Sequence, residues 1–472
     1  MRDNIKFRLF VCFLTASVVC TLPAYAATIW YVDSTAAPGG DGTSWATAYK
    51  DIQSAIDSAS GIWMICTAPP SQVWVKAGTY NLNTQITVNK VVAIYGGFDG
   101  TETTLSQRDW QNNTAIVNGN NSVRCFEVSI FCEINGLTIR NGSESSGAGI
   151  YIDAAPVFCS FGNYYLSPRI RNCTIRYNTA STAGGGIYVI DSDPAIQNCT
   201  FYGNSSGSGG AIYHISASPV IEKCVFYDNE STLPGSLGGG AIGGYSRNFT
   251  TGDLITITNC LFHDNNAGSW GGAISYNQVY PTITNCTFSQ NSADIAGGAF
   301  HGNMNSEAPK IRNSICWQNT PDELDIVTSS SYLDVSYCDV QGGWTGTGSN
   351  NIDANPNFVG SDNYHLLFGS PCIDTASNGY GPDDDLESIS RPRDGDGDAT
   401  ATCDMGAYEY TIGDFRVDGG VDLPDFSMFG ATWLCGPKDI YWNPVCDIST
   451  PKDNFINFRD LDVFVLHWLE GK

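Results

Sequence analysis

Residues 170–178 read Ile-Arg-Asn-Cys-Thr-Ile-Arg-Tyr-Asn, and the pattern Ile-x-Asn-Cys-x-Phe/Ile-x-x-Asn returns at 196–204, 221–229, 257–265 and 283–291. The copy at 221–229 has Lys223 in place of the first Asn, and a weaker copy at 311–319 has Ser314 in place of Cys. Phrases of the form Gly-Gly-Ala/Gly-Ile/Phe lie between the copies. The cysteines at 173, 199, 224, 260 and 286 are 26, 25, 36 and 26 residues apart. Repeats of this length indicate a solenoid in which each repeat packs on the previous one.

The order of side chains within a repeat predicts the type of solenoid. Cys173 and Ile175 share one parity and Ile170 has the other, so the inward direction changes at Asn172. Asn tolerates left-handed backbone, which predicts a bend there. Short β-branched or aromatic stretches without helical periodicity then predict a parallel β-helix whose coils advance about 4.8 Å each. We expect one ladder of stacked bend residues, interrupted by Lys223: Asn172, Asn198, Asn259, Asn285 and Asn313.

The composition excludes other classes of protein. The 472 residues include 48 acids and 23 bases, giving a net charge of −25, so the basic surface of a nucleic-acid binder is missing. A hydrophobic content of 42% is too high for a disordered acidic protein. Richness in Gly, Asn, Thr, Ser and Tyr argues against a helical bundle.

The first 26 residues have a basic start, an apolar run from Leu9 to Leu22 and the sequence Ala24-Tyr25-Ala26, which predict a signal peptide. We therefore expect a secreted or cell-surface protein. Of the 17 cysteines, 15 follow residue 26. The repeated cysteines favour packing inside the solenoid over a metal or disulfide ladder. The more plausible disulfides are Cys372 with Cys403 and Cys435 with Cys446.

Two acidic loops near the C-terminus have the spacing of calcium-binding loops, each followed by an apolar helix-like run at 423–434 or 458–469. Arg416 stands where the first loop should supply a third-position ligand, and Asn454 stands where the second usually has Gly. In the second loop, either Asp447 or Ser449 takes the first ligand position. The expected Ca²⁺ ligands are Asp414, Asp418, Asp422 and Asp425, then Asp447, Ser449, Asp453, Asn457 and Asp460. The acids at 394, 396 and 398 form either another calcium loop or a solvated surface loop.

The solenoid offers weak candidates for chemistry. Asp228 and Asp264 occupy the same position of successive repeats, with His263 beside Asp264, so they form either an acid/base or calcium site or a pair of solvated acids. Outward aromatic residues either bind sugar rings or stack on each other to stabilise the sheet. We expect outward columns in which His263 and His301 accompany the substrate-binding candidates Tyr188, Tyr202, Tyr213, Tyr227 and Trp317.

The repeated phrases resemble those of the right-handed parallel β-helix superfamily that includes pectate lyases, and the Gly-Gly-Ala-Ile and Phe-x-x-Asn phrases are similar to polymorphic outer-membrane protein repeats. Residues 30–33, 39–45, 47–58 and 73–80 look like the N-terminal cap and first coil of such proteins. Residues 351–356, 369–374 and 403–409 resemble the C-terminal end of secreted β-helix proteins of the choice-of-anchor type. The superfamily contains lyases, hydrolases, adhesins and structural proteins, so the resemblance implies the fold and leaves the activity open.

The duplicated acidic loops resemble a dockerin domain, which implies Ca²⁺ as cofactor and a cohesin-type scaffold protein as partner. The expected organisation is a signal peptide at 1–26, an all-β, right-handed single-stranded parallel β-helix at 27–410 and a small α-helical dockerin-like domain at 411–472. The phrases that mark polygalacturonases and the main pectate lyase family are missing from the sequence. We therefore expect a protein that binds or displays on polysaccharide; the alternative is a polysaccharide lyase or glycoside hydrolase tethered by its dockerin.

Overall fold

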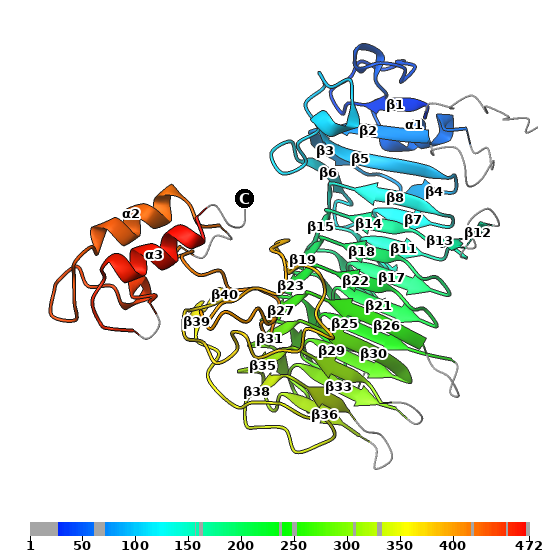
Figure 1. The fold of residues 1–472 in the computed structure, drawn as a ribbon. Coiled ribbons are helices and arrows are strands. Elements are labelled where there is room, and N and C mark those ends of the chain that lie inside the picture. Colours follow the sequence, from blue (N-terminus) through cyan, green and yellow to red (C-terminus); the bar gives the residue numbers. More distant parts are fainter. Residues whose placement is uncertain are drawn as a thin grey trace, which may run out of the picture.

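The computed structural model describes residues 27–60, 71–155, 157–159, 164–235, 238–247, 253–304, 308–327, 333–416, 420–449 and 452–468. The expected signal peptide lies outside these residues. The chain winds as a stack of coils, each adding one short strand to every long sheet, from the blue N-terminal end to the green C-terminal end in Figure 1. The architecture is a parallel β-helix, as the repeats predict.

Sheet A is the longest sheet, and all its neighbouring strands are parallel. Its order is β1 (Ile29–Val32), β2 (Ser71–Lys76), β5 (Val92–Phe98), β8 (Cys132–Asn135), β14 (Arg169–Arg171), β18 (Ala195–Gln197), β22 (Val220–Glu222), β26 (Asp253–Thr258), β30 (Val279–Thr284), β34 (Lys310–Arg312) and β37 (Asp334–Ser336).

Sheet B follows sheet A in each coil after a one-residue bend. Its order is β3 (Gly78–Asn81), β6 (Ala115–Asn118), β9 (Leu137–Arg140), β15 (Thr174–Arg176), β19 (Thr200–Tyr202), β23 (Val225–Tyr227), β27 (Leu261–His263), β31 (Thr287–Ser289), β35 (Ile315–Trp317) and β38 (Asp339–Val340).

Two further parallel sheets close the coil. Sheet C contains β4 (Ile86–Val88), β7 (Phe126–Val128), β11 (Ile150–Ile152), β17 (Ile187–Ile190), β21 (Ile212–Ile215), β25 (Ile242–Tyr245), β29 (Ile274–Asn277), β33 (Phe300–Asn303) and β36 (Leu324–Ile326). Sheet D contains β10 (Ser143–Ser146), β16 (Thr179–Ala183), β20 (Ser205–Ser208), β24 (Glu230–Ser231), β28 (Asn266–Ala267) and β32 (Ser292–Ala293). Two antiparallel pairs lie outside these sheets, β12 (Val157–Cys159) with β13 (Tyr164–Leu166) and β39 (Phe358–Gly360) with β40 (Asn363–Leu366).

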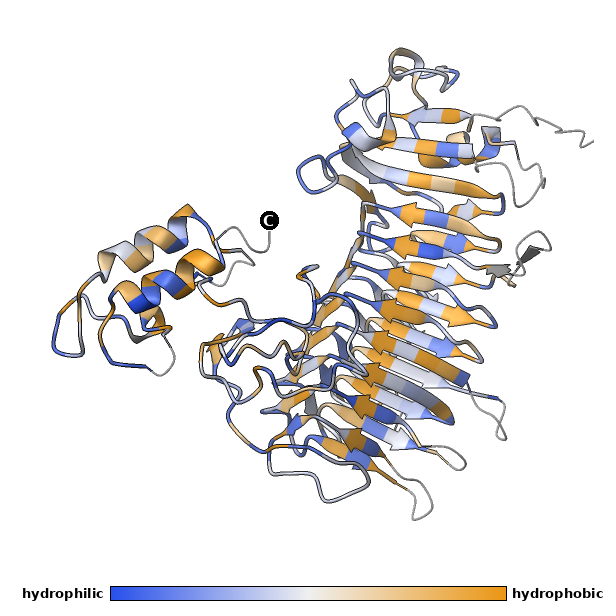
Figure 2. Cartoon of the chain, in the orientation of Figure 1, coloured by the Kyte–Doolittle hydropathy of each residue, from blue (hydrophilic) through white to orange (hydrophobic). Residues whose placement is uncertain are grey.

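The core runs as columns of identical side chains along the solenoid. In sheet B, Phe201, Phe226, Phe262 and Phe288 are fully buried and stack at 4.7–4.8 Å between ring centroids. Apolar and polar residues alternate along many of the strands in Figure 2, because one face of each strand points inward. The repeated cysteines from 173 to 286 are buried free thiols, as predicted. Such columns bury apolar area in every coil, so the hydrophobic core extends along the whole solenoid.

The bend between sheets A and B occurs where the sequence predicts it, but the expected asparagine ladder is incomplete. The bend residues, Lys223 included, have φ near +50°. Asn172 donates to Asn135 Oδ1 (3.0 Å) and Asn313 donates to Asn285 Oδ1 (3.1 Å). Asn259 and Asn285 instead donate to backbone carbonyls of Asp384 and Asp404. These donors thus attach the C-terminal region to the solenoid.

A continuous ladder forms at the last Asn of each repeat. Each side-chain Nδ2 before the last donates to the Oδ1 of the next Asn at 2.8–3.0 Å, and the backbone N–H of the same residue donates to that oxygen as well. The series is buried and runs through Asn178, Asn204, Asn229, Asn265, Asn291 and Asn319. Glu323 closes it by accepting from the Nδ2 and N–H of Asn319.

Helices close the N-terminal end and form the C-terminal module. Helix α1 (Ile52–Ser58) buries Ile52, Ala55 and Ile56 against the first strands, and Asp51 caps its N-terminus. Helices α2 (Leu423–Ala431) and α3 (Phe458–Leu466) lie apart from the solenoid in Figure 1. Short 3₁₀ turns occur at Trp45–Thr47, Leu105–Gln107 and Pro444–Cys446. Within the described residues, no helix is long and apolar enough to cross a membrane.

Residues 356–410, here called the end region, fold back over the outside of sheet B. Lys223 pairs with Asp384 at 2.6 Å, Gly406 N donates to Asn313 O, and the Tyr364 ring lies 5.0 Å from that of His263. The expected disulfides are wrong for this structure, since Cys372, Cys403, Cys435 and Cys446 are free thiols. Instead, Cys372 Sγ donates to Asp339 Oδ2 at 3.2 Å.

Candidate functional site

The second acidic loop brings three carboxylates together at the start of α3. Asp447, Asp453 and Asp460 each offer an oxygen, and these oxygens lie within 4.8 Å of one another. Asp447 is 1% exposed and Asp460 is fully buried. The Oδ1 of Asp447 and the Oγ of Ser449 are buried without a hydrogen-bond partner. Buried oxygens that lack donors fit a hard cation, which prefers oxygen ligands.

Helix capping fixes the geometry of this loop. Asn457 is the N-cap of α3 and Asp460 is its third residue, which together form a capping box. Asp460 Oδ1 accepts from the N–H groups of Ile448 and Ser449, both at 2.9 Å, so the loop is tied to the helix. Burial, followed by the neighbouring charge of Asp460, raises the pKa of the Asp447 carboxyl. A cation at this place would relieve both effects.

The first loop repeats this arrangement 35 residues earlier, with Asp422 as N-cap and Asp425 as third residue of α2. The buried Asp425 accepts from the N–H groups of Arg416 (3.0 Å) and Asp422 (2.9 Å). Asp414 is buried as well, while Asp418 lies outside the described residues. By this 35-residue spacing Ser449 is the counterpart of Asp414, yet the carboxylate group in the second loop contains Asp447.

The two units pack against each other through equivalent aromatic residues. The rings of Phe429 and Phe464, also 35 residues apart, stack at 5.3 Å, and Phe415 stacks on both. The apolar cluster continues through Tyr410 and Ile412 to Cys372 and Ile373 of the end region. The module is therefore built from two similar halves around one aromatic core.

A second group of three carboxylates lies in the end region. Asp374, Asp394 and Asp396 have oxygens within 4.8 Å of one another. The Oδ2 of Asp374 already accepts from the N–H groups of Gly395 and Asp396 at 2.8 and 2.7 Å. Burial raises the pKa of Asp374 to about 6. Asp398 is exposed and accepts from Thr400 N.

The catalytic candidates of the solenoid lie on an exposed bend. Asp228 and Asp264 both have φ near +53° and follow paired strands, so they are neighbours along the solenoid. His263 Nδ1 lies 2.7 Å from Asp264 Oδ2. Among the described residues, neither acid belongs to a group of three or more potential metal ligands. The arrangement offers one His–Asp pair at a surface bend, where Tyr364 of the end region lies against His263.

The outward aromatic residues stack on each other. Tyr202 and Tyr227 have centroids 4.8 Å apart with planes at 6°, and His263 continues the stack at 5.1 Å and 8°. Tyr188 and Tyr213 stack at 6.1 Å and 16° on sheet C. Parallel rings at these distances contact one another through their faces, so mainly edges and hydroxyls remain for a ligand.

The structure corrects the expected exposure of His301 and Trp317 and adds Tyr177 to the exposed aromatic residues. His301 is completely buried: Trp270 stacks on its ring at 5.6 Å, and its Nδ1 lies 2.8 Å from Oδ2 of its register partner Asp325. Trp317 is half-buried against the end region and is separated from His263 by Ser289. Sequence reasoning missed Tyr177, which is 51% exposed at the bend after β15. The signal available in the sequence was its position immediately before the ladder Asn178.

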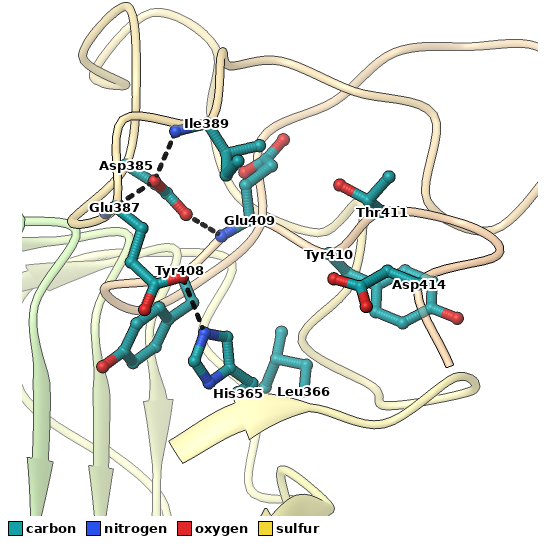
Figure 3. Close-up of a pocket in the computed structure, with 10 residues that line it drawn as sticks. All are labelled: His365, Leu366, Asp385, Glu387, Ile389, Tyr408, Glu409, Tyr410, Thr411 and Asp414. Atoms are coloured by element: carbon teal, nitrogen blue, oxygen red, sulfur yellow. Dashed lines mark hydrogen bonds and ion pairs between the residues drawn. The ribbon is translucent and has the colours of Figure 1, made fainter. Parts of the chain in front are cut away.

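The end region also contains buried carboxylates around a small pocket. Figure 3 shows Asp385 accepting from the N–H groups of Glu387, Ile389 and Glu409, with His365 beside Glu387. Burial raises the pKa of Glu409 to about 7, although Arg391 lies 3.4 Å away. The space open to water in this pocket is about 10 Å³, room for one water molecule. The hydrogen bonds of Asp385 tie residues 387, 389 and 409 of the end region together.

Continuous parallel sheets, cysteines repeated every 25 to 36 residues and buried side-chain columns define a solenoid protein of the parallel β-helix class. The family model described as "Right handed beta helix region" matches residues 112–363, and the chain belongs to this family.

The chain is similar to solved structures of a pectate lyase and of a pectin methylesterase. A pectate lyase, Pel9A, is 13% identical with a TM-score of 0.46, and the match covers 81% of this chain and 96% of that one. The pectin methylesterase from Aspergillus niger is 14% identical with a TM-score of 0.33, covering 70% and 87%. No curated protein matches the sequence significantly.

Proposed function

We propose that this chain is an exported β-helix protein that binds polysaccharide along its solenoid and is attached to a scaffold at the cell surface by its C-terminal module. The grouped carboxylates of Asp447, Asp453 and Asp460 carry the proposal. Three grouped carboxylates repel one another, and Asp447 Oδ1 and Ser449 Oγ beside them are buried without a hydrogen-bond partner, so a cation would stabilise the group. The signal-peptide pattern at 1–26 supports export.

The module residues would hold Ca²⁺ in two loops of unequal quality. In the second loop the ligands are Asp447, Ser449, Asp453, Asn457 and Asp460; in the first they are Asp414, Asp418, Asp422 and Asp425. Bound Ca²⁺ would supply positive charge that joins each loop to the start of its helix. Arg416 replaces an oxygen ligand in the first loop, so we expect weaker binding there.

Calorimetric titration of the purified chain with Ca²⁺ tests the module. We expect heat from the wild type, loss of the tighter site in Asp460→Ala and loss of the weaker site in Asp425→Ala. Asp462→Ala is the matched control, because it removes an exposed acid from the same helix. Heat that is unchanged in both loop variants would reject the calcium assignment.

A cohesin-type scaffold protein is the proposed partner of the module. Leu423 and Phe458 occupy equivalent positions at the start of the two helices, and each is 70% exposed. Exposed apolar residues at repeated positions are typical of a contact surface. We expect Ca²⁺-dependent capture by a cohesin that is lost in Leu423→Asp plus Phe458→Asp; capture unaffected by chelator would contradict this attachment.

Polysaccharide binding is proposed for the outer face of sheet B. It is supported by exposed Tyr177 and by the row of tyrosine edges that follows it. Affinity electrophoresis through gels that contain neutral or acidic polysaccharides tests this part. We expect retardation by at least one glycan, and normal migration in every gel would reject it.

The second candidate is a polysaccharide lyase or glycoside hydrolase, and the His263–Asp264 pair beside Asp228 favours it. A hydrogen-bonded His–Asp pair can move a proton at an exposed bend. New reducing ends or unsaturated products from acidic glycans, abolished in Asp264→Ala, would support this reading. Product formation that persists in Asp228→Ala and Asp264→Ala would exclude these residues from catalysis.

A further inference from the structure

Two arginines occupy neighbouring positions on the outer face of sheet B. Arg140 of β9 and Arg176 of β15 are direct register partners, so their backbones lie one strand spacing apart, about 4.8 Å. The same outward column continues with Tyr202, the register partner of Arg176 in β19. Like charges placed opposite each other in a sheet are destabilising unless something compensates them.

No acid compensates this pair within the part of the chain that the structure describes. Neither arginine forms an ion pair there, and the Nε atoms of both are buried without a hydrogen-bond partner. Arg176 Nη1 donates to the Tyr202 hydroxyl at 2.5 Å, a neutral acceptor. Lys76, Lys223 and Arg247 each pair with an Asp. Other cations bond to neutral acceptors, among them Arg108, Arg124 and Arg171. Arg140 and Arg176 differ from these in lying directly opposite each other, and two adjacent cations without an acid fit an external anion.

Tyr177 supplies an apolar surface beside these cations. Its ring lies against the backbone of Gly203, where a Cβ atom would come within 2.5 Å of Tyr177 Cε1. Its φ of +53° turns the side chain outward, and half of it is exposed. The Arg176 guanidinium lies 5.7 Å from its ring centroid, and Tyr202 meets it at 80° rather than stacking on it. Unlike the stacked tyrosines, Tyr177 therefore has ring surface free for a ligand.

We propose that Arg140, Arg176 and Tyr177 form a binding site for an acidic sugar chain, in which the guanidinium groups bind a carboxylate or sulfate and Tyr177 contacts a sugar ring. Guanidinium groups bind planar oxyanions through paired hydrogen bonds, and aromatic faces accept the apolar side of a ring. The end region, which contains β39 and β40, lies in Figure 1 against coils of the solenoid that come after β9 and β15. The inference rests on the proposed polysaccharide binding and names its ligand class.

Matched ligands and matched variants test the site. Isothermal titration uses a uronic-acid oligosaccharide, the same oligosaccharide with its carboxylates reduced to alcohols, and a sulfated oligosaccharide of similar length. We expect binding of the uronic-acid or sulfated chain, with affinity falling roughly tenfold in Arg140→Gln and in Arg176→Gln. Arg247→Gln is the control, because it removes one exposed positive charge that already pairs with Asp191.

The outcomes separate this inference from the proposed function. The uronic-acid and sulfated arms decide which oxyanion is bound, and Arg176→Lys should lose affinity despite keeping its charge. Tyr177→Ala should weaken binding of the acidic chain, and thermal melting of each variant verifies folding. Equal affinity for the acidic and reduced chains, or equal losses in Arg247→Gln, would overturn the inference while polysaccharide binding stands. Failure to bind any glycan in the gels would reject both.

Discussion

Replacing Glu323 by Gln should change how the stability of the solenoid depends on pH. Glu323 is 7% exposed and accepts two hydrogen bonds from Asn319 at the end of the buried ladder. Burial raises the pKa of its carboxyl to about 7, with Asp322 and Asp339 adding to the shift, although the Asn319 bonds lower it. The folded state therefore holds a proton that the unfolded chain releases near its ordinary pKa of 4.5.

The sign and size of the effect follow from this difference. A carboxyl whose pKa is raised on folding contributes its full stability below its ordinary pKa, and that stability falls as pH rises through the folded value. A shift from 4.5 to about 7 corresponds to about 3.4 kcal/mol in total. About 2.5 kcal/mol of it is lost between roughly pH 5 and pH 8. Gln cannot ionise, but the NH₂ of its amide group then faces one of the two Asn319 donors. This loss of a hydrogen bond should lower the free energy of unfolding by about 1 kcal/mol at any pH.

We measure the free energy of unfolding by urea titration with tryptophan fluorescence at pH 5 and pH 8. The Glu323→Gln variant should have nearly the wild-type stability at pH 5 and be more stable than the wild type by about 2 kcal/mol at pH 8. Glu230→Gln, which changes an exposed glutamate on β24, is the control and should follow the wild type. Wild-type and Glu323→Gln stabilities that fall in parallel with pH would refute the reasoning.

Two further predictions concern the interior. Asn265→Ala breaks the buried ladder between Asn229 and Asn291 and should lower the unfolding free energy by about 3 kcal/mol, because donors are left unsatisfied. The control Asn266→Ala changes an exposed residue and should alter the unfolding free energy by less than about 0.5 kcal/mol. Equal effects in the two variants would contradict the role of the ladder. Mass spectrometry after alkylating the unfolded, unreduced chain should find Cys372, Cys403, Cys435 and Cys446 all modified, since each is a free thiol, and a cross-linked peptide containing any of them would contradict the structure.

The solenoid could be predicted from sequence because its contacts repeat with the chain. Each coil packs only on its neighbours, so a phrase such as 196–204 implies the same phrase above and below it in space. Parity placed the bend at Asn172 and the thiols inside, and both positions are confirmed. The expected ladder forms only in part, because the bend side chains of Asn259 and Asn285 bond to the end region instead. The complete ladder lies at Asn178 and its counterparts, where Asn recurs in every repeat and the side chains face the interior.

The candidate sites depended more strongly on three-dimensional contacts. The spacing of the acidic loops predicts Asp447, Asp453 and Asp460 as ligands, but the sequence leaves open whether Asp447 or Ser449 begins the loop. The structure groups the Asp447 carboxylate with the other two and also buries Ser449 Oγ without a partner. Likewise, outward parity identified Tyr202 and Tyr227, but only ring distances show that they stack on each other.

The sequence by itself determined the class of solenoid, the inward columns, the bend position and the duplicated acidic loops, because these follow from local spacing and from contacts between adjacent repeats. The tertiary structure decided which asparagines form the ladder, which cysteines stay unbridged and where the end region covers sheet B. It also brought out unpaired Arg140 and Arg176 beside Tyr177. These features depend on contacts between segments tens to more than a hundred residues apart, and no local spacing specifies such distances.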